Sequence, residues 1–397
     1  MDAKQLLRIG SFLKKHTEDF FKNNKFAKEL AIRMEEETGT RFSDWIDSFV
    51  FPSDSQMRKK IEKLGFECSE TDKDVFYVAE TSFPRIVMRD SCFEVVLVVD
   101  SVVAFRARNK LRVPIEGSAC SLARTMSISN KRDYVLSVVE RSTVMGYVVP
   151  VDIDSEEFLQ QKKARDLWFN RERDFELATE GMRQTLSLAY RIVDMVGVER
   201  AAHIVLQSEL AYWQYKTHVG DLQKFFQDKC GLGWGNCDHL TFWSGRKNFK
   251  ILVQIFETLG FRCSKSFFVK DYGNKGVQVM EHPHSSVLIV CEVHLRKKER
   301  DQDFAHQELA PMQSSGILDN WLRANGESML KGGAKHVAIK CSIEKMQAHL
   351  VKYHVHSTKV DEKPYFKQAY SNKIASKFEN FLCFVERNGG FRYFDFD

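Results

Sequence analysis

The chain has 397 residues, which is enough for two or three domains, and its 43% hydrophobic and 28% charged residues are ordinary for a globular protein. A net charge of only +5 from dispersed basic residues argues against a nucleic-acid partner, and no apolar stretch is long enough to span a membrane. The N-terminal residues lack the apolar centre of a signal peptide, and nine cysteines without a Cys-x-x-Cys pair favour buried thiols in a reducing compartment. We therefore expect a cytoplasmic protein with no nucleic-acid and no membrane partner.

The first 150 residues predict a helical cap followed by a small α+β segment. Apolar side chains recur at helical spacing through residues 2–36, so the cap is expected to cover residues 1–40. The segment 41–150 then changes to a strand, a helix over 57–64 with Gly65 just beyond its end, and further strands. These strands, joined by short turns that suit an antiparallel meander, are expected at 75–78, 85–88, 93–99, 134–141 and 146–150.

A helical segment separates this part from the rest of the chain. Residues 155–229 carry apolar side chains on helical faces and no strand signal, which predicts a helical insert over 151–235. The second half, residues 236–397, begins with a strand at 238–242 and a helix at 247–259. The remaining expected elements are strands at 265–269, 276–280, 287–293, 335–341 and 381–387, and helices at 317–322 and 343–353.

The two halves repeat one pattern. Asp-Ser-Phe-Val-Phe at 47–51 matches Asp-His-Leu-Thr-Phe at 238–242, and each is followed by a helix and the sequence Leu-Gly-Phe. Later strands are also similar, and we match 93–99 with 286–291 and 136–141 with 382–387. His239 stands where the first half has Ser48. This difference suggests one structural half and one working half.

Three motifs of the second half resemble those of the 4-hydroxyphenylpyruvate dioxygenases, which belong to the vicinal oxygen chelate superfamily. They are Asp-His-Leu-Thr-Phe at 238–242, Gly-Ala-Lys-His-Val-Ala-Ile at 333–339, and Phe-Leu-Cys-Phe-Val-Glu-Arg-Asn-Gly-Gly-Phe at 381–391. They occur in the order of the family over residues 236–397, with a weaker echo at 41–150. The resemblance implies an α+β fold of repeated βαβββ modules that form half-open barrels around a metal ion.

Two histidines in these motifs are the leading candidates for metal ligands. Non-haem iron(II) oxygenases use two imidazoles and one carboxylate on one face, which leaves positions for a chelating substrate and O2. His239 and His336 each lie near the start of a strand, and strand alternation should turn Asp238 and Lys335 to the opposite face. Both histidines are therefore expected to face inward and to hold Fe(II), with Zn(II) or another divalent metal as the alternative.

Several residues compete for the third ligand position. In the register closest to the family, its glutamate falls on Cys383, and Glu386 would need a bulge in order to turn inward. Glu292 is a further candidate because many members of the superfamily place a carboxylate there, and Glu379 shares a face with Cys383. A cysteine thiolate would favour zinc or copper(I) over iron(II) oxygenase chemistry. His306, in the connection before 317–322, is a candidate catalytic contact to the substrate.

The resemblance implies a mononuclear non-haem Fe(II) dioxygenase, an oxidoreductase acting on a small 2-oxo acid or a related oxygen chelator. Its partners would be this small-molecule substrate, O2 and, by analogy, a second copy in a homodimer. One alternative is a divalent-metal isomerase, lyase or hydrolase of the same superfamily, such as a glyoxalase-like enzyme, which needs no O2. The other alternative is a non-catalytic binding protein with a decayed site.

Overall fold

The computed structural model describes residues 3–352, apart from residues 71, 79–82, 120, 122, 132, 142–153, 270–273, 286 and 313–315. The described residues fall into two compact units. The first unit contains the described residues within 1–153, 224–236 and 340–349, and the second contains those within 154–223, 237–339 and 350–397. No helix of the described residues is long and apolar enough to cross a bilayer.

The first unit is a seven-stranded mixed sheet covered by N-terminal helices. Its elements are α1 (Ala3–Asn23), α2 (Lys25–Thr38), η1 (Phe42–Trp45), β1 (Ile46–Pro52), α3 (Ser55–Leu64), β2 (Glu67–Cys68), β3 (Val75–Tyr77), β4 (Arg85–Arg89), β5 (Phe93–Val98), α4 (Val102–Arg108), β6 (Ala123–Lys131) and β7 (Tyr134–Arg141). The strand order is β2-β3-β4-β1-β5-β7-β6. Strand β1 is parallel to β4 and antiparallel to β5, and β5 is parallel to β7.

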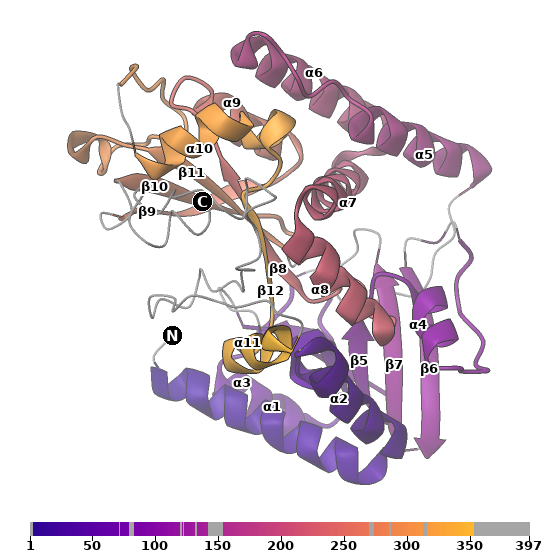
Figure 1. Cartoon of the computed structure of the whole chain (residues 1–397). Coiled ribbons are helices and arrows are strands. Elements are labelled where there is room, and N and C mark those ends of the chain that lie inside the picture. The colour runs from indigo at the N-terminus through magenta and orange to yellow at the C-terminus, as the bar shows by residue number, and fades with distance from the viewer. Residues whose placement is uncertain are drawn as a thin grey trace. The chain divides into compact units, whose positions relative to one another are not determined.

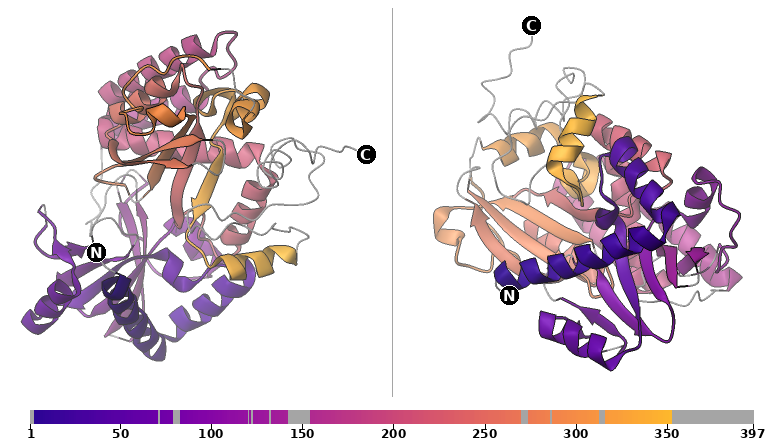
Figure 2. Two further views of the ribbon diagram at one scale, coloured as in Figure 1. Left: turned by 90° about the vertical axis from the view of Figure 1, so that its left-hand side faces the viewer. Right: turned by 90° about the horizontal axis from the view of Figure 1, so that it is seen from below.

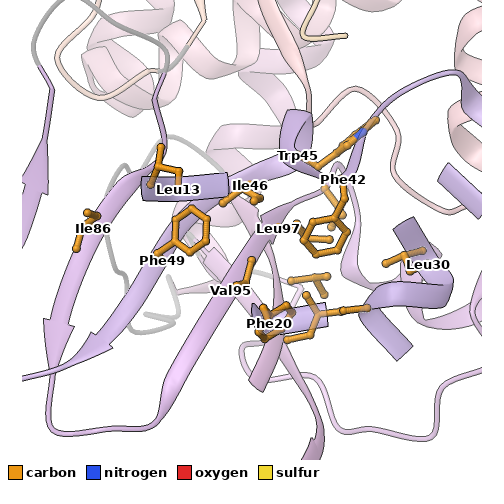
Figure 3. Packing of buried hydrophobic residues seen from close by; sticks show 14 of the residues in the cluster. Leu13, Phe20, Leu30, Phe42, Trp45, Ile46, Phe49, Ile86, Val95 and Leu97 are labelled. Carbon is orange, nitrogen blue, oxygen red and sulfur yellow. The ribbon is translucent and has the colours of Figure 1, made fainter. Parts of the chain in front are cut away.

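Alternation along β1 gives the first sheet one strongly apolar face. Phe49 and Phe51 are buried in a large cluster with Phe20 of α1 and Leu30 of α2, and Figure 3 shows several of these side chains together. Helices α1 and α2 lie across this face (Figure 2). The opposite face carries Ser48 and a small cluster of valines, so it is less bulky.

The second unit contains a five-stranded sheet in the order β12-β8-β11-β10-β9. Its elements are α5 (Ser155–Phe169), α6 (Ala178–Val196), α7 (Val198–Lys216), β8 (Cys237–Trp243), α9 (Phe249–Thr258), β9 (Arg262–Val269), β10 (Lys275–Glu281), β11 (Leu288–His294), η2 (Lys297–Glu299), α10 (Ile317–Asn325), η3 (Ser328–Gly332) and β12 (His336–Ile339). Helices α8 (His218–Lys229) and α11 (Ile343–Val351) each contain residues assigned to both units.

Helices pack on both faces of the second sheet (Figure 1). Phe242 of β8 stacks against Phe256 of α9, with 5.0 Å between ring centroids. Trp243, the next residue, points to the other face and meets Trp321 of α10 at 5.5 Å. The odd-numbered residues of β8 therefore share the face that α10 partly covers, and the even-numbered residues face α9.

Two segments of the chain have the same connectivity. In β1–α3–β2–β3–β4 the first strand is parallel to the last, and β8–α9–β9–β10–β11 repeats this arrangement with β8 parallel to β11. A further strand, β5 or β12, then pairs antiparallel with the opening strand. The predicted α+β class is confirmed, with two mixed sheets, whereas the half-open barrels stay a prediction.

The structure corrects two details of the sequence analysis. The counterpart of β11 is β4 and not the run 93–99, because β5 occupies the position of β12. Helix α4 was not predicted, and Ser101 caps it through the Ala104 N–H. The helical pattern expected over 2–36 is confirmed as two helices, and the Asn24 side chain begins α2 by accepting a hydrogen bond from the Ala27 N–H at 2.9 Å. The strands expected at 146–150 and 381–387 lie outside the described residues.

Candidate metal centre

Two buried histidines meet on one face of the second sheet. His336 of β12 lies opposite Thr241 of β8, and Ala338 lies opposite His239, so both histidines share the face of Trp243. Figure 1 shows β8 and β12 side by side. The two Nε2 atoms are 3.2 Å apart, and the residues are only 5% and 7% exposed. The structure therefore brings together two predicted ligands that are 97 residues apart in the chain.

The spacing of these nitrogens fits a shared metal ion. An ion that binds two imidazoles at about 2.1 Å, with an angle of about 90–110° between them, places their nitrogens roughly 3.0–3.4 Å apart. In the metal-free pair, one Nε2–H donates to the other Nε2, so the same spacing also serves a hydrogen bond. Imidazole is a donor that suits iron and zinc alike, so the pair alone does not choose between them.

Asp238 orients the first histidine. Its Oδ2 lies 2.9 Å from Nδ1 of His239, which favours the tautomer with a proton on Nδ1 and a lone pair on Nε2. A carboxylate behind an imidazole is the usual support for a metal ligand. The sequence analysis expected Asp238 to point to the opposite face. That expectation is wrong for its carboxylate, which reaches back to the neighbouring ring.

The surroundings of His336 keep its imidazole neutral. Its Nε2 lies 3.1 Å from Oγ1 of Thr241 as well as close to His239. Burial, and then the nearby His239, Lys335 and Lys275, hold the pKa of His336 well below its ordinary value. The imidazole is therefore neutral at neutral pH, as a metal ligand requires.

A tryptophan and two lysines extend the same face beyond the histidines. The ammonium groups of Lys275 and Lys335 lie 5.2 and 4.9 Å from the ring centroid of Trp243. Lys335 was expected to point away from this face, but its ammonium group reaches Trp243 because the residue precedes the first residue of β12. Two ammonium groups thus lie on this face, and one of them, that of Lys275, is paired with the carboxylate of Glu292.

Glu292 belongs to this extended face but is engaged with other groups. Its Oε2 accepts hydrogen bonds from Nε1 of Trp243 at 2.6 Å and from Nζ of Lys275 at 2.9 Å. Its Oε1 is buried without a hydrogen-bond partner. Among the described residues, no third histidine, cysteine or carboxylate donor lies within 4.8 Å of both histidine nitrogens. The structure thus does not bring Glu292 to the pair.

The helices of the insert hold the segment that leads into β12. Arg171 donates to the Met329 carbonyl at 2.8 Å, and Arg173 donates to the Leu330 carbonyl at 3.3 Å. Lys216 donates to the next two carbonyls, those of residues 331 and 332, at 2.6 and 3.0 Å. This stretch of backbone ends four residues before His336, so the contacts fix the start of the ligand-bearing strand.

One fully buried carboxylate organises these arginines. Glu209 of α7 pairs with Arg171 at 2.8 Å and with Arg173 at 2.9 Å, and it accepts from Nε1 of Trp168 at 2.7 Å. Burial opposes the charge of Glu209, but the two arginines hold its pKa below the ordinary value. The sequence analysis did not find this role, because arginines and a glutamate 36 or more residues apart give no local signal.

The remaining candidate residues are not part of the histidine pair. His306 lies with Glu257, Cys263 and Asp303, and its Nε2 is 2.8 Å from Oε1 of Glu257. Cys383 and Glu386 lie outside the described residues, as does Glu379.

The chain is similar to solved structures at low sequence identity. No protein-family model and no curated protein matches the sequence. Solved structures that are similar include a mutant of 4-hydroxymandelate synthase from Streptomyces coelicolor, at 10% identity and a TM-score of 0.24, over 80% of this chain and 76% of that chain. They also include an Mn(II)-bound glyoxalase from Novosphingobium aromaticivorans, at 11% identity and a TM-score of 0.21, over 70% of this chain and 90% of that chain. Both are members of the superfamily that the sequence motifs resemble, but TM-scores this low carry no argument about fold or function.

Proposed function

We propose that the chain is a mononuclear metal enzyme in which His239 and His336 bind the ion. The observation that carries this proposal is the pair of buried Nε2 atoms, 3.2 Å apart on one face of a sheet. With Fe(II) bound, the proposed reaction is that of a non-haem dioxygenase on a small 2-oxo acid or a related oxygen-chelating substrate. The ion would then supply Lewis acidity and redox chemistry toward O2.

The residues around the pair suit an anionic chelating substrate. Lys335 brings positive charge beside the ring of Trp243, where Lys275 is already paired with Glu292, and a substrate carboxylate would be attracted to Lys335. Asp238 keeps the imidazole of His239 oriented, with its Nε2 lone pair directed away from the carboxylate. Both histidines are buried, which limits the access of bulk water to the pair.

The first sheet suggests where the third donor comes from. Its Ser48 and Glu94 hold the positions of His239 and His336, because Val50 pairs with Glu94 as Thr241 pairs with His336. Ser137 shares a face of the sheet with Glu94, because Val96 pairs with Ser137, and Ser137 is the sequence counterpart of Cys383. By this correspondence in sequence we propose Cys383, which lies outside the described residues, as the third metal donor.

Glu386 lies outside the described residues and stays a candidate third ligand. Its counterpart, Glu140, accepts a hydrogen bond from the Val102 N–H at 2.9 Å and so caps α4, and it also lies 3.8 Å from Arg124.

The thiol at position 383 favours a second candidate function. A site with two imidazoles and a thiolate suits Zn(II) better than Fe(II) oxygenase chemistry. In that case, the enzyme would be a divalent-metal isomerase, lyase or hydrolase that polarises an oxygen-chelating substrate without O2.

Reconstitution under anaerobic conditions separates these functions. The purified chain is loaded with Fe(II) or Zn(II), and O2 consumption is followed with a panel of 2-oxo acids. O2 uptake that depends on Fe(II) and is lost in His239→Ser supports the dioxygenase, whereas Zn(II) binding that is lost in His239→Ser, without O2 uptake, supports the second candidate. If His239→Ser changes the binding of neither metal, both functions are contradicted and a binding protein with a decayed site remains. Ser48→Ala, in the first sheet, is the matched control.

A further inference from the structure

We propose that Glu257, Cys263 and His306 form a second metal site, which binds zinc and is separate from the histidine pair. The three residues come from the last turn of α9, the start of β9 and the connection after η2. Their donor atoms lie within 4.8 Å of one another, and this is the one cluster of three or more such donors among the described residues. The proposal does not rest on the proposed function.

The distances within this cluster are close to those of a zinc site. Nε2 of His306 lies 2.8 Å from Oε1 of Glu257 and 3.9 Å from Sγ of Cys263. Tetrahedral zinc with bonds of about 2.3 Å to sulfur and about 2.0–2.1 Å to nitrogen and oxygen would place these atoms roughly 3.3 and 3.6 Å apart. Shifts of about half an ångström by partly exposed side chains would therefore complete the geometry.

The donor set and its support favour zinc over harder ions. A thiolate, an imidazole and a carboxylate are all established zinc ligands, whereas magnesium and calcium prefer oxygen alone. Asp303 lies 2.7 Å from Nδ1 of His306, so it can hold the ring with the Nε2 lone pair toward Glu257 and Cys263. With three protein donors, a water molecule would occupy the fourth position.

This cluster belongs to the face of the sheet opposite the histidine pair. Cys263 pairs with Met280 of β10, and Sδ of Met280 lies 4.0 Å from Sγ of Cys291. Cys291 alternates with Glu292 along β11, so it faces α9 and not Trp243. The proposed zinc would therefore join α9, β9 and the connection that carries His306, at a position that solvent can reach.

The test measures zinc binding in a chain that lacks the first site. In a His239→Ser/His336→Ala background, the expected result is about one zinc per chain by titration against a chromogenic chelator. Cobalt(II) in its place should give the near-ultraviolet charge-transfer absorption of a cobalt–thiolate bond. The affinities for zinc and for cobalt(II) should both fall by about a hundredfold or more when Cys263→Ser or His306→Ala is added, because each substitution removes one of three protein donors.

Cys68→Ser in the same background is the matched control, because Cys68 is an exposed free cysteine of the first unit. It should leave zinc affinity and the cobalt absorption unchanged. Circular dichroism of each variant identifies any loss of fold. If Cys263→Ser is unstable, His306→Ala tests the site instead, because His306 is exposed. The proposal is overturned if the background binds no zinc, or if zinc binding survives both Cys263→Ser and His306→Ala. The background already lacks the histidine pair, so this measurement does not depend on it. A negative result would therefore contradict the second metal site and leave the proposed function untouched.

Discussion

The two sheets of the chain have the same strand connectivity but present different chemistry on one face. In the first sheet this face carries Ser48 and Glu94 at the positions where the second carries His239 and His336. The opening aspartates also differ in partner: Asp47 forms a two-point ion pair with Arg141, whereas Asp238 supports an imidazole. One scaffold thus holds an ion pair or a proposed metal site, depending on a few side chains.

The comparison shows that backbone register, rather than local sequence, creates the histidine pair. The antiparallel pairing of β12 with β8 sets Thr241 opposite His336, and the equivalent pairing of β5 with β1 sets Val50 opposite Glu94. Given this register, imidazoles at the two positions meet without any change in the backbone. The two sheets also differ in what precedes the strand that pairs antiparallel with the opening strand. Strand β12 follows a segment that helices hold through hydrogen bonds, whereas β5 follows a short turn.

The largest effect is expected from Glu209→Gln. The substitution leaves Arg171 and Arg173 buried beside a neutral amide, so the free energy of unfolding should fall by about 3–5 kcal/mol. Chemical denaturation, followed by circular dichroism, measures the change. Glu176→Gln, at an exposed position of the same segment, should change stability by less than about 0.5 kcal/mol. Equal stability of the two variants would contradict a supporting role for the buried cluster.

The next effect is expected from His239→Ser, which places the residue of the first sheet into the second. Metal affinity at the pair should fall by about a hundredfold or more, because one of two imidazole donors is removed. The first sheet accepts serine at this position, so the variant should remain folded. Isothermal titration with Fe(II) or Zn(II) measures the affinity. Unchanged affinity would show that the pair is a hydrogen bond and not a metal site.

Asp238→Asn should have a smaller effect on the same affinity. The amide supports the His239 imidazole less strongly than the carboxylate, so metal binding should weaken by about ten- to a hundredfold. Asp47→Asn is the matched variant in the first sheet. It should lower stability by about 1–3 kcal/mol through loss of the ion pair with Arg141 and leave metal affinity unchanged. An equal loss of metal binding in both variants would argue for general destabilisation.

The smallest effect is expected from Glu94→Gln, at the position that matches His336. Burial, partly offset by the Ser137 hydroxyl, raises the pKa of Glu94 above its ordinary value near 4.5. A raised folded pKa means that this group stabilises the fold most below pH 4.5, and the contribution is lost as the pH rises through the folded value. Glu94→Gln should therefore raise stability at neutral pH by less than about 1 kcal/mol and have little effect at pH 4. Thermal unfolding at the two pH values tests this, and the opposite pH dependence would contradict it.

Patterns that act over a few residues predicted much of the fold. Gly65 follows α3 in the left-handed conformation, at φ 100°, as its position in the sequence indicated. The repeat of Leu-Gly-Phe located α3 and α9 correctly, and the motif resemblance selected the two histidines that the structure brings together. The match of 93–99 with the second half was wrong because an apolar run identifies a strand but not its place in a sheet.

Contacts between distant residues could not be predicted in the same way. The ion pair of Lys275 with Glu292 depends on the pairing of β10 with β11, and the Glu209 cluster depends on how three helices pack. The grouping of His306 with Cys263 depends on where a long connection crosses a strand. Each of these requires a tertiary arrangement that sequence spacing does not contain.

The most direct test of the central claim is metal content by elemental analysis after anaerobic Fe(II) or Zn(II) loading and removal of free metal. Wild-type protein is compared with the His239→Ala/His336→Ala variant, and Ser48→Ala serves as the control from the first sheet. The account predicts that about one metal ion per chain disappears in the double variant and is retained in the control. Equal metal content in wild type and the double variant would contradict the assignment of this histidine pair as a metal centre.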